Sequence, residues 1–154
     1  MIDHLTIRRA GRADVAALMA ICAEHAAFER LPGRHGERAD ALADALEGSP
    51  PALYAWLACV NDAIVGYASA TVDFSTLDRA RFLHMDCLYV RAAWRNRAVG
   101  RALWQHVHAQ AMALDCIAVQ WQTPAWNDHA ARFYRRLGAS ESAKLRYVLP
   151  LGVA

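Results

Sequence analysis

One stretch of this chain joins an apolar segment to an amphipathic helix pattern through a short basic loop. Residues 82–90 are rich in strand formers and contain neither proline nor glycine, which is typical of a strand buried on both faces. Residues 91–101 then contain four arginines. From Val99 onward, apolar residues recur at the spacing with which a helix buries one face, at Leu103, Val107, Ala111 and Leu114. This order of strand, cationic loop and helix predicts an anion site where the helix begins.

The chemistry of the loop suits a phosphate group. The first turn of a helix leaves four backbone N–H groups unpaired and carries the positive end of the helix dipole, so phosphate oxygens can replace water there. Gly100 has no side chain and Ala98 has only a methyl group, while the arginines can add charge-assisted hydrogen bonds. The alternative is a solvated basic loop before an ordinary helix, and the spacing alone favours neither.

Two motifs in the chain resemble a known family, the GCN5-related N-acetyltransferases (GNAT). Arg95-Asn96-Arg97-Ala98-Val99-Gly100 is similar to the family's pyrophosphate loop, Arg/Gln-x-x-Gly-x-Gly/Ala, with Ala98 where the family usually has glycine. Downstream, residues 127–139 resemble the family's next helix, Asn-x-x-Ala-x-x-Phe-Tyr-x-x-x-Gly-Ala/Phe. Within the family the chain looks nearest to the diamine (spermidine/spermine) acetyltransferases.

The resemblance and the apolar patterns agree on an α/β fold. We expect a single GNAT-like N-acetyltransferase domain over residues 1–154, with a central mixed β-sheet flanked by helices in the order β-α-α-β-β-β-α-β-α-β. The strands are expected at residues 5–8, 53–60, 63–74, 82–90, 116–123 and 145–149. The first helix begins after Asp14 and buries Val15, Leu18, Cys22 and Phe28. The others are expected at residues 37–47, 99–114 and 127–138, with a loop at 31–36; Asn127 is the expected N-cap of the last helix and Gly138 its end. Asn61-Asp62 predicts a tight hairpin, because both residue types tolerate positive φ.

Composition excludes several classes of protein. The formal charge of +2 is too small for a nucleic-acid footprint, and no apolar run approaches the ~20 residues of a membrane span. The N-terminus lacks the basic-then-apolar layout of a secretion signal, so we expect a cytoplasmic protein. No metal site is expected, because His106 and His108 are two apart on a helix and share no face. Reduced, buried thiols are expected at Cys22, Cys59, Cys87 and Cys116.

The resemblance implies acetyl-CoA as co-substrate. In the family, the pantetheine arm pairs like an extra strand with the central strand, and a backbone N–H near a bulge polarises the thioester carbonyl. The residues expected to bind it are Leu88, Tyr89, Val90, Arg95, Asn96, Arg97, Ala98, Val99, Gly100, Arg101, Asn127 and Phe133.

Two residues are candidates for acid and base catalysis. Tyr134 matches the tyrosine that many family members direct at the coenzyme A sulfur, where a phenol can protonate the leaving thiolate. Asp86 falls where the diamine subgroup has a glutamate that removes the ammonium proton, and a carboxylate in so apolar a strand is costly to bury unless it is paired or lines a wet cavity. His84, two residues earlier, is the alternative base or a partner for Asp86, and a purely structural salt bridge is a further alternative.

The expected reaction is direct transfer of an acetyl group to a primary amine of a small molecule, such as an amino acid side chain, a diamine or a polyamine. The candidate acceptor-binding residues are Phe28, Glu29, Asp86 and Trp121. The alternatives are a non-catalytic acyl-CoA-binding module and an acetyltransferase that acts on a protein or peptide amine. A homodimer is expected by analogy with the subgroup, which pairs through its C-terminal strands.

Overall fold

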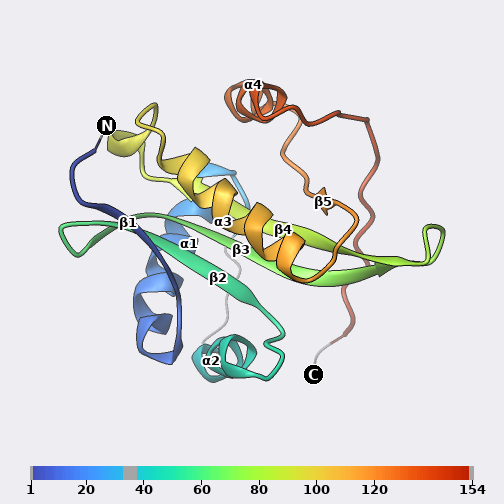
Figure 1. Ribbon diagram of the computed structural model, residues 1–154, viewed down its shortest axis with the longest axis horizontal. Coiled ribbons are helices and arrows are strands. Elements are labelled where there is room, and N and C mark those ends of the chain that lie inside the picture. The colour runs from blue at the N-terminus through green and yellow to red at the C-terminus, as the bar shows by residue number, and fades with distance from the viewer. Residues whose placement is uncertain (1, 33–37, 153–154) are drawn as a thin grey trace. The chain divides into compact units, whose positions relative to one another are not determined.

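The fold is organised by a mixed sheet with strands in the order β1-β2-β3-β4-β5 (Figure 1). It is seen in a computed structural model that describes residues 2–32 and 38–152. Strands β1 to β4 pair antiparallel in succession, and β5 is parallel to β4. The strands are β1 (Leu5–Arg9), β2 (Tyr54–Val60), β3 (Ala63–Ser75), β4 (Ala80–Val90) and β5 (Val119–Gln120). The helices are α1 (Val15–Phe28), α2 (Ala39–Glu47), α3 (Val99–Ala113) and α4 (Asp128–Arg136), with 3₁₀ turns η1 (Arg12–Asp14) and η2 (Ala92–Trp94).

The chain divides into two compact units. The first runs to Gln122 and holds the sheet with α1, α2 and α3, and the second begins at Thr123 and holds α4 and the residues after it. The α/β class and the mixed sheet agree with the sequence-based prediction.

A two-residue turn joins β2 to β3 as the sequence predicted. Asn61 and Asp62 have φ of 48° and 66°, and Val60 pairs with Ala63 across the turn. Positive φ at both central residues matches the right-handed twist of the strands, so the turn sets the register of this hairpin. Every residue of β2 is buried, so this strand lies in the core of the first unit.

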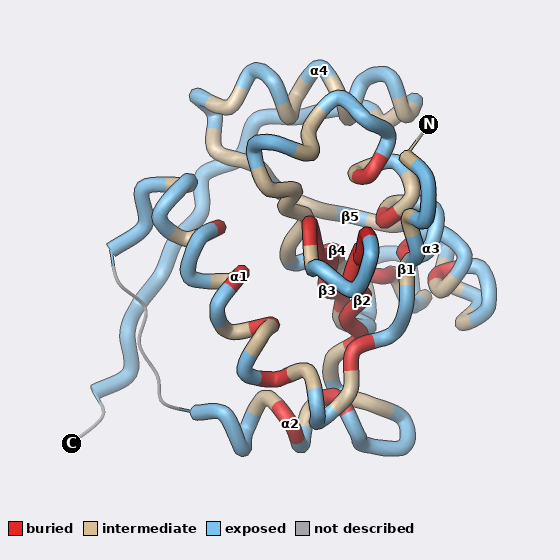
Figure 2. Tube along the Cα trace, turned by 90° about the vertical axis from the view of Figure 1, so that its left-hand side faces the viewer, coloured by how far each residue is buried: buried red, intermediate tan, exposed pale blue. Residues whose placement is uncertain are grey.

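Helices cover both faces of the sheet in the first unit: α1 and α2 lie on one side of the strands and α3 on the other (Figure 2). Of the residues predicted for the buried side of α3, Val99, Leu103, Val107 and Ala111 are buried, whereas Leu114 follows the end of the helix and is only partly buried. The buried side of α1 differs from the prediction. The buried residues of α1 are Val15, Leu18, Ile21 and His25, whereas Phe28 is 39% exposed. The last turn of α1 thus buries a histidine in place of the expected aromatic ring.

The second helix is shorter than predicted. The described part of α2 begins at Ala39, and Glu37 lies outside the described residues, as does most of the loop expected at residues 31–36. Its buried side chains are Ala43 and Leu46. The helix ends before Gly48 as predicted.

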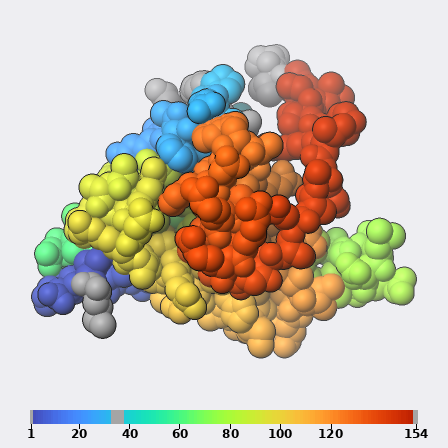
Figure 3. All heavy atoms as spheres, turned by 90° about the horizontal axis from the view of Figure 1, so that it is seen from above, coloured from blue at the N-terminus to red at the C-terminus, as the bar shows by residue number. Residues whose placement is uncertain are grey.

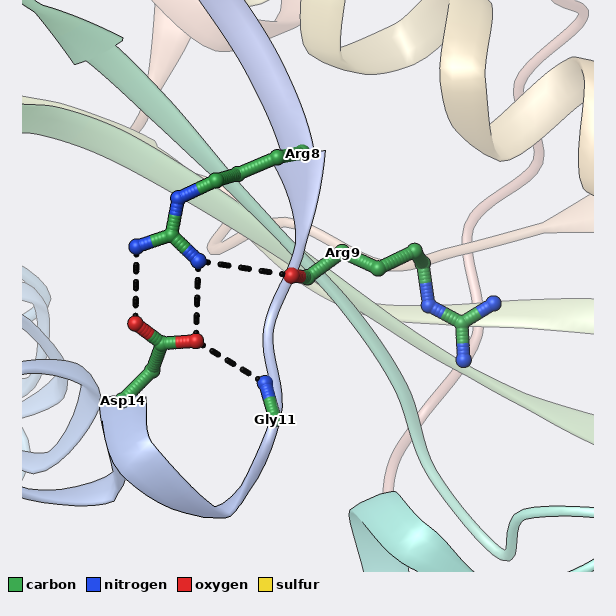
Figure 4. A network of polar contacts seen from close by, with 4 residues as sticks. All are labelled: Arg8, Arg9, Gly11 and Asp14. Atoms are coloured by element: carbon green, nitrogen blue, oxygen red, sulfur yellow. Dashed lines mark hydrogen bonds and ion pairs between the residues drawn. The ribbon is translucent and has the colours of Figure 1, made fainter.

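The start of α1 is fixed to the first strand by a charged cluster (Figure 4). The Arg8 guanidinium donates to both carboxylate oxygens of Asp14, at 2.9 and 2.7 Å, and the backbone N–H of Gly11 donates to the same carboxylate at 2.9 Å. The Arg8 guanidinium and the Gly11 N–H hold the pKa of Asp14 below its ordinary value. This cluster closes the turn between β1 and the helix layer.

The second unit contains the predicted helix. The Asn127 side chain accepts a hydrogen bond from the N–H of Ala130 at 3.2 Å, which is the predicted N-cap. Gly138 follows the helix with φ of 90°, as a helix-terminating glycine does.

The last two predicted strands require correction. The strand expected at residues 116–123 is reduced to Val119 and Gln120. The strand expected at residues 145–149 is absent from the described residues after α4, and its apolar side chains are between 65% and 86% exposed. A strand needs a neighbour to pair its backbone groups, and an alternating apolar pattern does not supply one.

Candidate active site

The central feature of the site is an open edge of β4. Strand β3 pairs with the full length of β4, but β5 pairs only with Leu83 and His84. From Met85 onward, no strand of the described residues pairs with that side of β4. Backbone donors and acceptors on such an edge can pair with an extended ligand, as an added strand does. Leu88 and Tyr89, which were expected to bind the pantetheine arm, lie on this stretch.

A β-bulge lies in the middle of the same stretch. Ser69 of β3 pairs with Cys87 and Ala70 pairs with Met85, so Asp86 is an extra residue without a partner on β3. The bulge turns the Asp86 carboxylate outward, where its side chain is 61% exposed. Asp86 therefore does not pay the cost of burial that the apolar strand suggested. Its Oδ1 lies 4.0 Å from His84 Nε2, so the two candidate bases are neighbours.

The loop after β4 presents an uncapped helix terminus. No side chain caps the N-terminus of α3, and Ala98 at the N-cap has φ of 65°. Asn96, Arg97, Ala98 and Arg101 are exposed, and the loop forms part of the molecular surface, in yellow in Figure 3. The backbone N–H groups of the first turn and the nearby guanidinium groups have the chemistry that a diphosphate requires. The residues present therefore fit the phosphates of coenzyme A.

The four arginines of the loop have different surroundings. Arg91 forms an ion pair with Glu24 at 2.8 Å and donates to the carbonyl oxygen of Ile64 at 2.6 Å, so it ties β4 to α1 and β3. The guanidinium of Arg97 lies 5.4 Å from the centre of the Trp94 ring. Arg101 is exposed on the first turn of α3. Arg91 therefore has a structural role, and Arg97 and Arg101 remain the exposed candidates for phosphate.

Arg95 lies between the loop and the end of α1. Its Nε donates to the carbonyl oxygen of Val90 at 2.8 Å. Its guanidinium carbon lies 4.5 Å from the centre of the Phe28 ring and 5.5 Å from that of Tyr89, within range of a cation–π interaction. The structure thus brings one candidate cofactor-binding residue, Arg95, next to one candidate acceptor-binding residue, Phe28.

A buried hydrogen-bonded chain at the end of α1 was missed by the sequence analysis. His25 Nδ1 lies 2.6 Å from the hydroxyl of Tyr67 on β3, and His25 Nε2 lies 3.1 Å from Oε1 of Glu29. Tyr89 of β4 stacks on the His25 ring, with centroids 5.0 Å apart. The one signal in the sequence was the spacing of His25 and Glu29, which are four residues apart and so share a helix face.

Burial controls the ionisation of the groups around this chain. Burial raises the pKa of the Tyr67 hydroxyl far above its ordinary value, so the phenol keeps its proton. Burial also raises the pKa of the neighbouring Cys87 thiol to about 12 and that of Cys22 above its ordinary value. A thiol with so high a pKa is a poor nucleophile at neutral pH.

Trp121 follows β5 directly and packs against helix α3. Its ring centre is 4.9 Å from that of Trp104 on α3. Helix α3 covers the face of the sheet opposite to α1, which carries Phe28 and precedes Glu29 (Figure 2). The structure therefore groups Phe28, Glu29 and Tyr89 and associates Trp121 with α3.

The second unit holds the remaining candidates. Tyr134 is partly buried on α4, with its ring centre 5.4 Å from that of Phe133. Asn127, a candidate for cofactor binding, uses its side-chain oxygen to cap the helix.

The described residues offer neither a metal-binding cluster nor a membrane-spanning helix. Within residues 2–32 and 38–152, no three histidine, cysteine, aspartate or glutamate side chains are grouped so that they could hold a metal ion. None of the helices seen there has the length and apolar character to cross a membrane.

Comparison with known proteins identifies the family. The model of the acetyltransferase (GNAT) family matches residues 15–139. A thialysine N-epsilon-acetyltransferase of Caenorhabditis elegans is 25% identical over 117 residues, which are 76% of this chain and 71% of that protein. The chain belongs to the GNAT family and is an acetyltransferase, as its two motifs predicted.

Solved structures share the fold. One is an aminoglycoside acetyltransferase from an uncultured soil metagenomic sample in complex with trehalose, with a TM-score of 0.83 and 18% identity, covering 97% of this chain and 98% of that one. Another is AAC(6′)-Iy in complex with the bisubstrate analog CoA-S-monomethyl-acetylneamine, with a TM-score of 0.81 and 17% identity, covering 97% of this chain and 100% of that one. At these identities the likeness concerns the fold alone.

Proposed function

We propose that this protein transfers the acetyl group of acetyl-CoA directly to a primary amine of a small molecule. The observation that carries the proposal is the continuous feature formed by the open edge of β4 and the uncapped N-terminus of α3. An extended thiol-bearing arm with a diphosphate at its far end matches that feature. Membership of the GNAT family supports the same co-substrate, and one structural neighbour contains a coenzyme A bisubstrate analog.

We assign the coenzyme A site to three groups of residues. Leu88, Tyr89 and Val90 offer the strand edge, residues 95–101 offer the phosphate site, and Asn127 and Phe133 are the candidates from the second unit. When bound, acetyl-CoA supplies an activated thioester carbonyl. A backbone N–H at the Asp86 bulge is the candidate donor to that carbonyl oxygen, because bulges redirect backbone groups away from the ladder.

The acid and base assignments follow from exposure and chemistry. Asp86 is exposed enough to remove the ammonium proton through a water molecule, with His84 as the alternative base. Tyr134 is the candidate acid for the leaving thiolate. Direct transfer is favoured over an acetyl-cysteine intermediate, because Cys87, the cysteine on the β4 edge, has a pKa of about 12.

The acceptor we propose is a compact amine. A long polycation needs a carboxylate for each ammonium that leaves water, and the candidate site offers Glu29 and Asp86. The segment after Gly138 is short and contributes one acid, Glu141, which is paired with Arg135 at 2.8 Å. Relatives named for thialysine and for aminoglycosides are consistent with small amines in general.

A thiol-release assay tests the function. Acetyl-CoA would be combined in turn with thialysine, lysine, putrescine, neamine and spermine at physiological salt. We expect thiol release with a higher kcat/KM for a compact amine than for spermine. Tight binding of coenzyme A without release for any amine would instead favour the acyl-CoA-binding module, and release with a peptide alone would favour a protein acceptor. A clear preference for spermine would contradict the proposed acceptor class.

The phosphate site has its own test. Gly100→Asp adds bulk and negative charge where the phosphate is expected, so coenzyme A affinity falls at least 10-fold, and Gly100→Ala is the matched control with a smaller loss. Unchanged affinity of folded Gly100→Asp would remove the site from this loop.

Three further properties remain proposals. We propose that the two units form one acetyltransferase domain, because the family match runs from residue 15 to residue 139 and so includes parts of both.

A homodimer is proposed because the exposed apolar residues 145–151 lack cover in the described chain. Light scattering at micromolar concentration is expected to give about twice the chain mass of 17.0 kDa, and a monomer would contradict the dimer. A cytoplasmic location also stays a prediction.

A further inference from the structure

The hydrogen-bonded chain Tyr67–His25–Glu29 is built more elaborately than the packing of α1 on the sheet requires. The side chains of Tyr67 and His25 are buried. The two partners of His25 are Tyr67 on β3 and Glu29, the residue that follows α1. Both ring nitrogens of His25 are used, so the imidazole has no nitrogen left to bind a substrate directly. We propose that Tyr67 and His25 are positioning residues that orient the Glu29 carboxylate to receive the acceptor amine. This inference rests on the function proposed above.

The direction of the hydrogen bonds follows from the chemistry of the partners. An ionised glutamate only accepts, so in a neutral imidazole the proton lies on Nε2 and is donated to Glu29 Oε1. His25 Nδ1 is then an acceptor, and the Tyr67 hydroxyl must donate to it. Burial raises the pKa of Tyr67, which keeps that donor protonated at all physiological pH values. One buried phenol therefore fixes the tautomer of His25 and, through it, the orientation of the carboxylate.

Aromatic packing fixes the imidazole plane as well. Tyr89 stacks on the His25 ring with an interplanar angle of 17°, and Tyr67 meets the same ring edge-on at 71°. The ring therefore has neither a free nitrogen nor a free orientation. Its rigid position is what a carboxylate needs from a supporting residue, since an unsupported glutamate loses side-chain entropy on binding a cation.

The location of Glu29 shows what the hydrogen-bonded chain Tyr67–His25–Glu29 could position. The carboxylate follows α1 directly and is 23% exposed, so it is partly buried yet reachable from solvent. Its partner His25 stacks on Tyr89, whose ring lies 5.9 Å from that of Phe28, and Tyr89 belongs to the open edge of β4. An ammonium group bound by Glu29 would therefore stand next to the proposed acetyl-CoA edge. A compact amine with a second ammonium group is the chemical class that such a site selects.

A double-mutant cycle tests the inference. Tyr67→Phe removes only the hydroxyl that fixes His25, and Glu29→Gln removes the charge that His25 orients. Tyr54→Phe is the matched control, because Tyr54 is a buried tyrosine of the same sheet that belongs to the Arg9–Trp56 cluster. The readouts are the Kd of thialysine, lysine and putrescine for the coenzyme A-loaded protein, the KM and kcat of the tightest of them, the Kd of coenzyme A, and the Tm.

We expect Tyr67→Phe to raise the Kd and KM of the amine about 10-fold, as for loss of one buried hydrogen bond, with kcat and coenzyme A affinity within about twofold of wild type. In the Glu29→Gln background the same substitution is expected to have no further effect, because the two residues act through one chain. Tyr54→Phe is expected to leave all binding constants unchanged.

His25 provides a second, independent set of variants. His25→Gln keeps one acceptor and one donor and is expected to bind the amine with an affinity between wild type and His25→Leu, which keeps neither. If a His25 variant does not fold, the Tyr67→Phe cycle still decides the question, since it deletes a single atom.

The inference is overturned if Tyr67→Phe leaves amine affinity unchanged or weakens it equally in the Glu29→Gln background. It is also overturned if no amine binds the coenzyme A-loaded protein. Amine binding that depends on Tyr67 without any thiol release would support the positioning chain while contradicting the proposed enzymatic function, so the two failures are distinguishable.

Discussion

Arg95 Nε donates a hydrogen bond of 2.8 Å to the carbonyl oxygen of Val90 and thereby ties the first residue of the phosphate-loop motif to the last residue of β4. The rest of the guanidinium lies over Phe28 and Tyr89. The residue that family resemblance assigns to phosphate thus also fixes the angle between the strand edge and the loop. Its side chain joins the proposed cofactor and acceptor sites.

Replacing Arg95 by lysine tests this dual role. Lysine keeps the charge but loses the Nε donor and the planar stacking surface. Substitution by lysine should therefore cost more at Arg95, which uses both features, than at the exposed Arg97. We expect Arg95→Lys to lower Tm and to weaken coenzyme A binding about 10-fold. Arg97→Lys, at an exposed position, is expected to change both by much less. Equal effects of the two variants in calorimetry and thermal unfolding would show that Arg95 acts only as a charge.

Ala98 adopts a conformation that glycine adopts more readily. Its φ of 65° is left-handed, which costs an L-residue roughly 1–2 kcal/mol, while glycine costs about 0.5–1 kcal/mol more conformational entropy on folding. We therefore expect Ala98→Gly to stabilise the protein by about 0.5–1 kcal/mol in chemical denaturation. Ala109→Gly, the same change at an exposed position inside α3, is expected to destabilise it by about 1 kcal/mol. Destabilisation by both would refute strain at Ala98.

The sequence predicted the elements whose signals are local. The Asn61-Asp62 turn, the buried side of α3 and the Asn127 cap each depend on a few adjacent residues or a regular period, and all three were correct. The strand at residues 145–149 had an equally clear apolar pattern but no strand of the described residues pairs with it. Pairing is a long-range property, and the apolar pattern carries no information about it.

The candidate site, like the fold, was predicted from the sequence only where its signals are local. Motif matching located the loop at residues 95–101, but it did not reveal that Asp86 lies on a bulge, since a bulge depends on the register between β3 and β4. His25 was missed because its importance comes from Tyr67, 42 positions away in the chain. The helical spacing of His25 and Glu29 was visible in the sequence, but the residues that bury His25 were not.

Asp14 is expected to make stability depend on pH in the acid range. Its folded-state pKa lies below the ordinary value of 3.8, so it stabilises the folded protein above that pH and loses this contribution as pH falls through the folded pKa. Asp14→Asn is expected to lower the free energy of unfolding by about 1 kcal/mol at neutral pH. The difference from wild type is expected to shrink below about pH 4 in urea titrations. A difference that persists undiminished at pH 2 would mean that the charge is not its source.

The choice of base between Asp86 and His84 is open to kinetics. Asp86→Asn is expected to depress kcat/KM, most strongly at lower pH, where more of the amine is protonated and a base is needed. His84→Ala is expected to have the smaller effect if the histidine only neighbours the carboxylate at 4.0 Å. If His84→Ala is the more damaging change while Asp86→Asn is mild, the roles are reversed.

Tyr134 is the remaining candidate, and its role can be separated from packing. It is partly buried on α4 beside Phe133, so removal of its hydroxyl alone leaves that ring contact in place. As the acid for the leaving thiolate, Tyr134→Phe is expected to fold normally, to bind coenzyme A as wild type does, and to lose about 10²- to 10⁴-fold in kcat. Tyr147→Phe, at a tyrosine that is 86% exposed in the same unit, is the control and is expected to keep full activity. Full activity of Tyr134→Phe would leave this tyrosine with a packing role only, and the proton for the thiolate would then have to come from solvent or from another side chain.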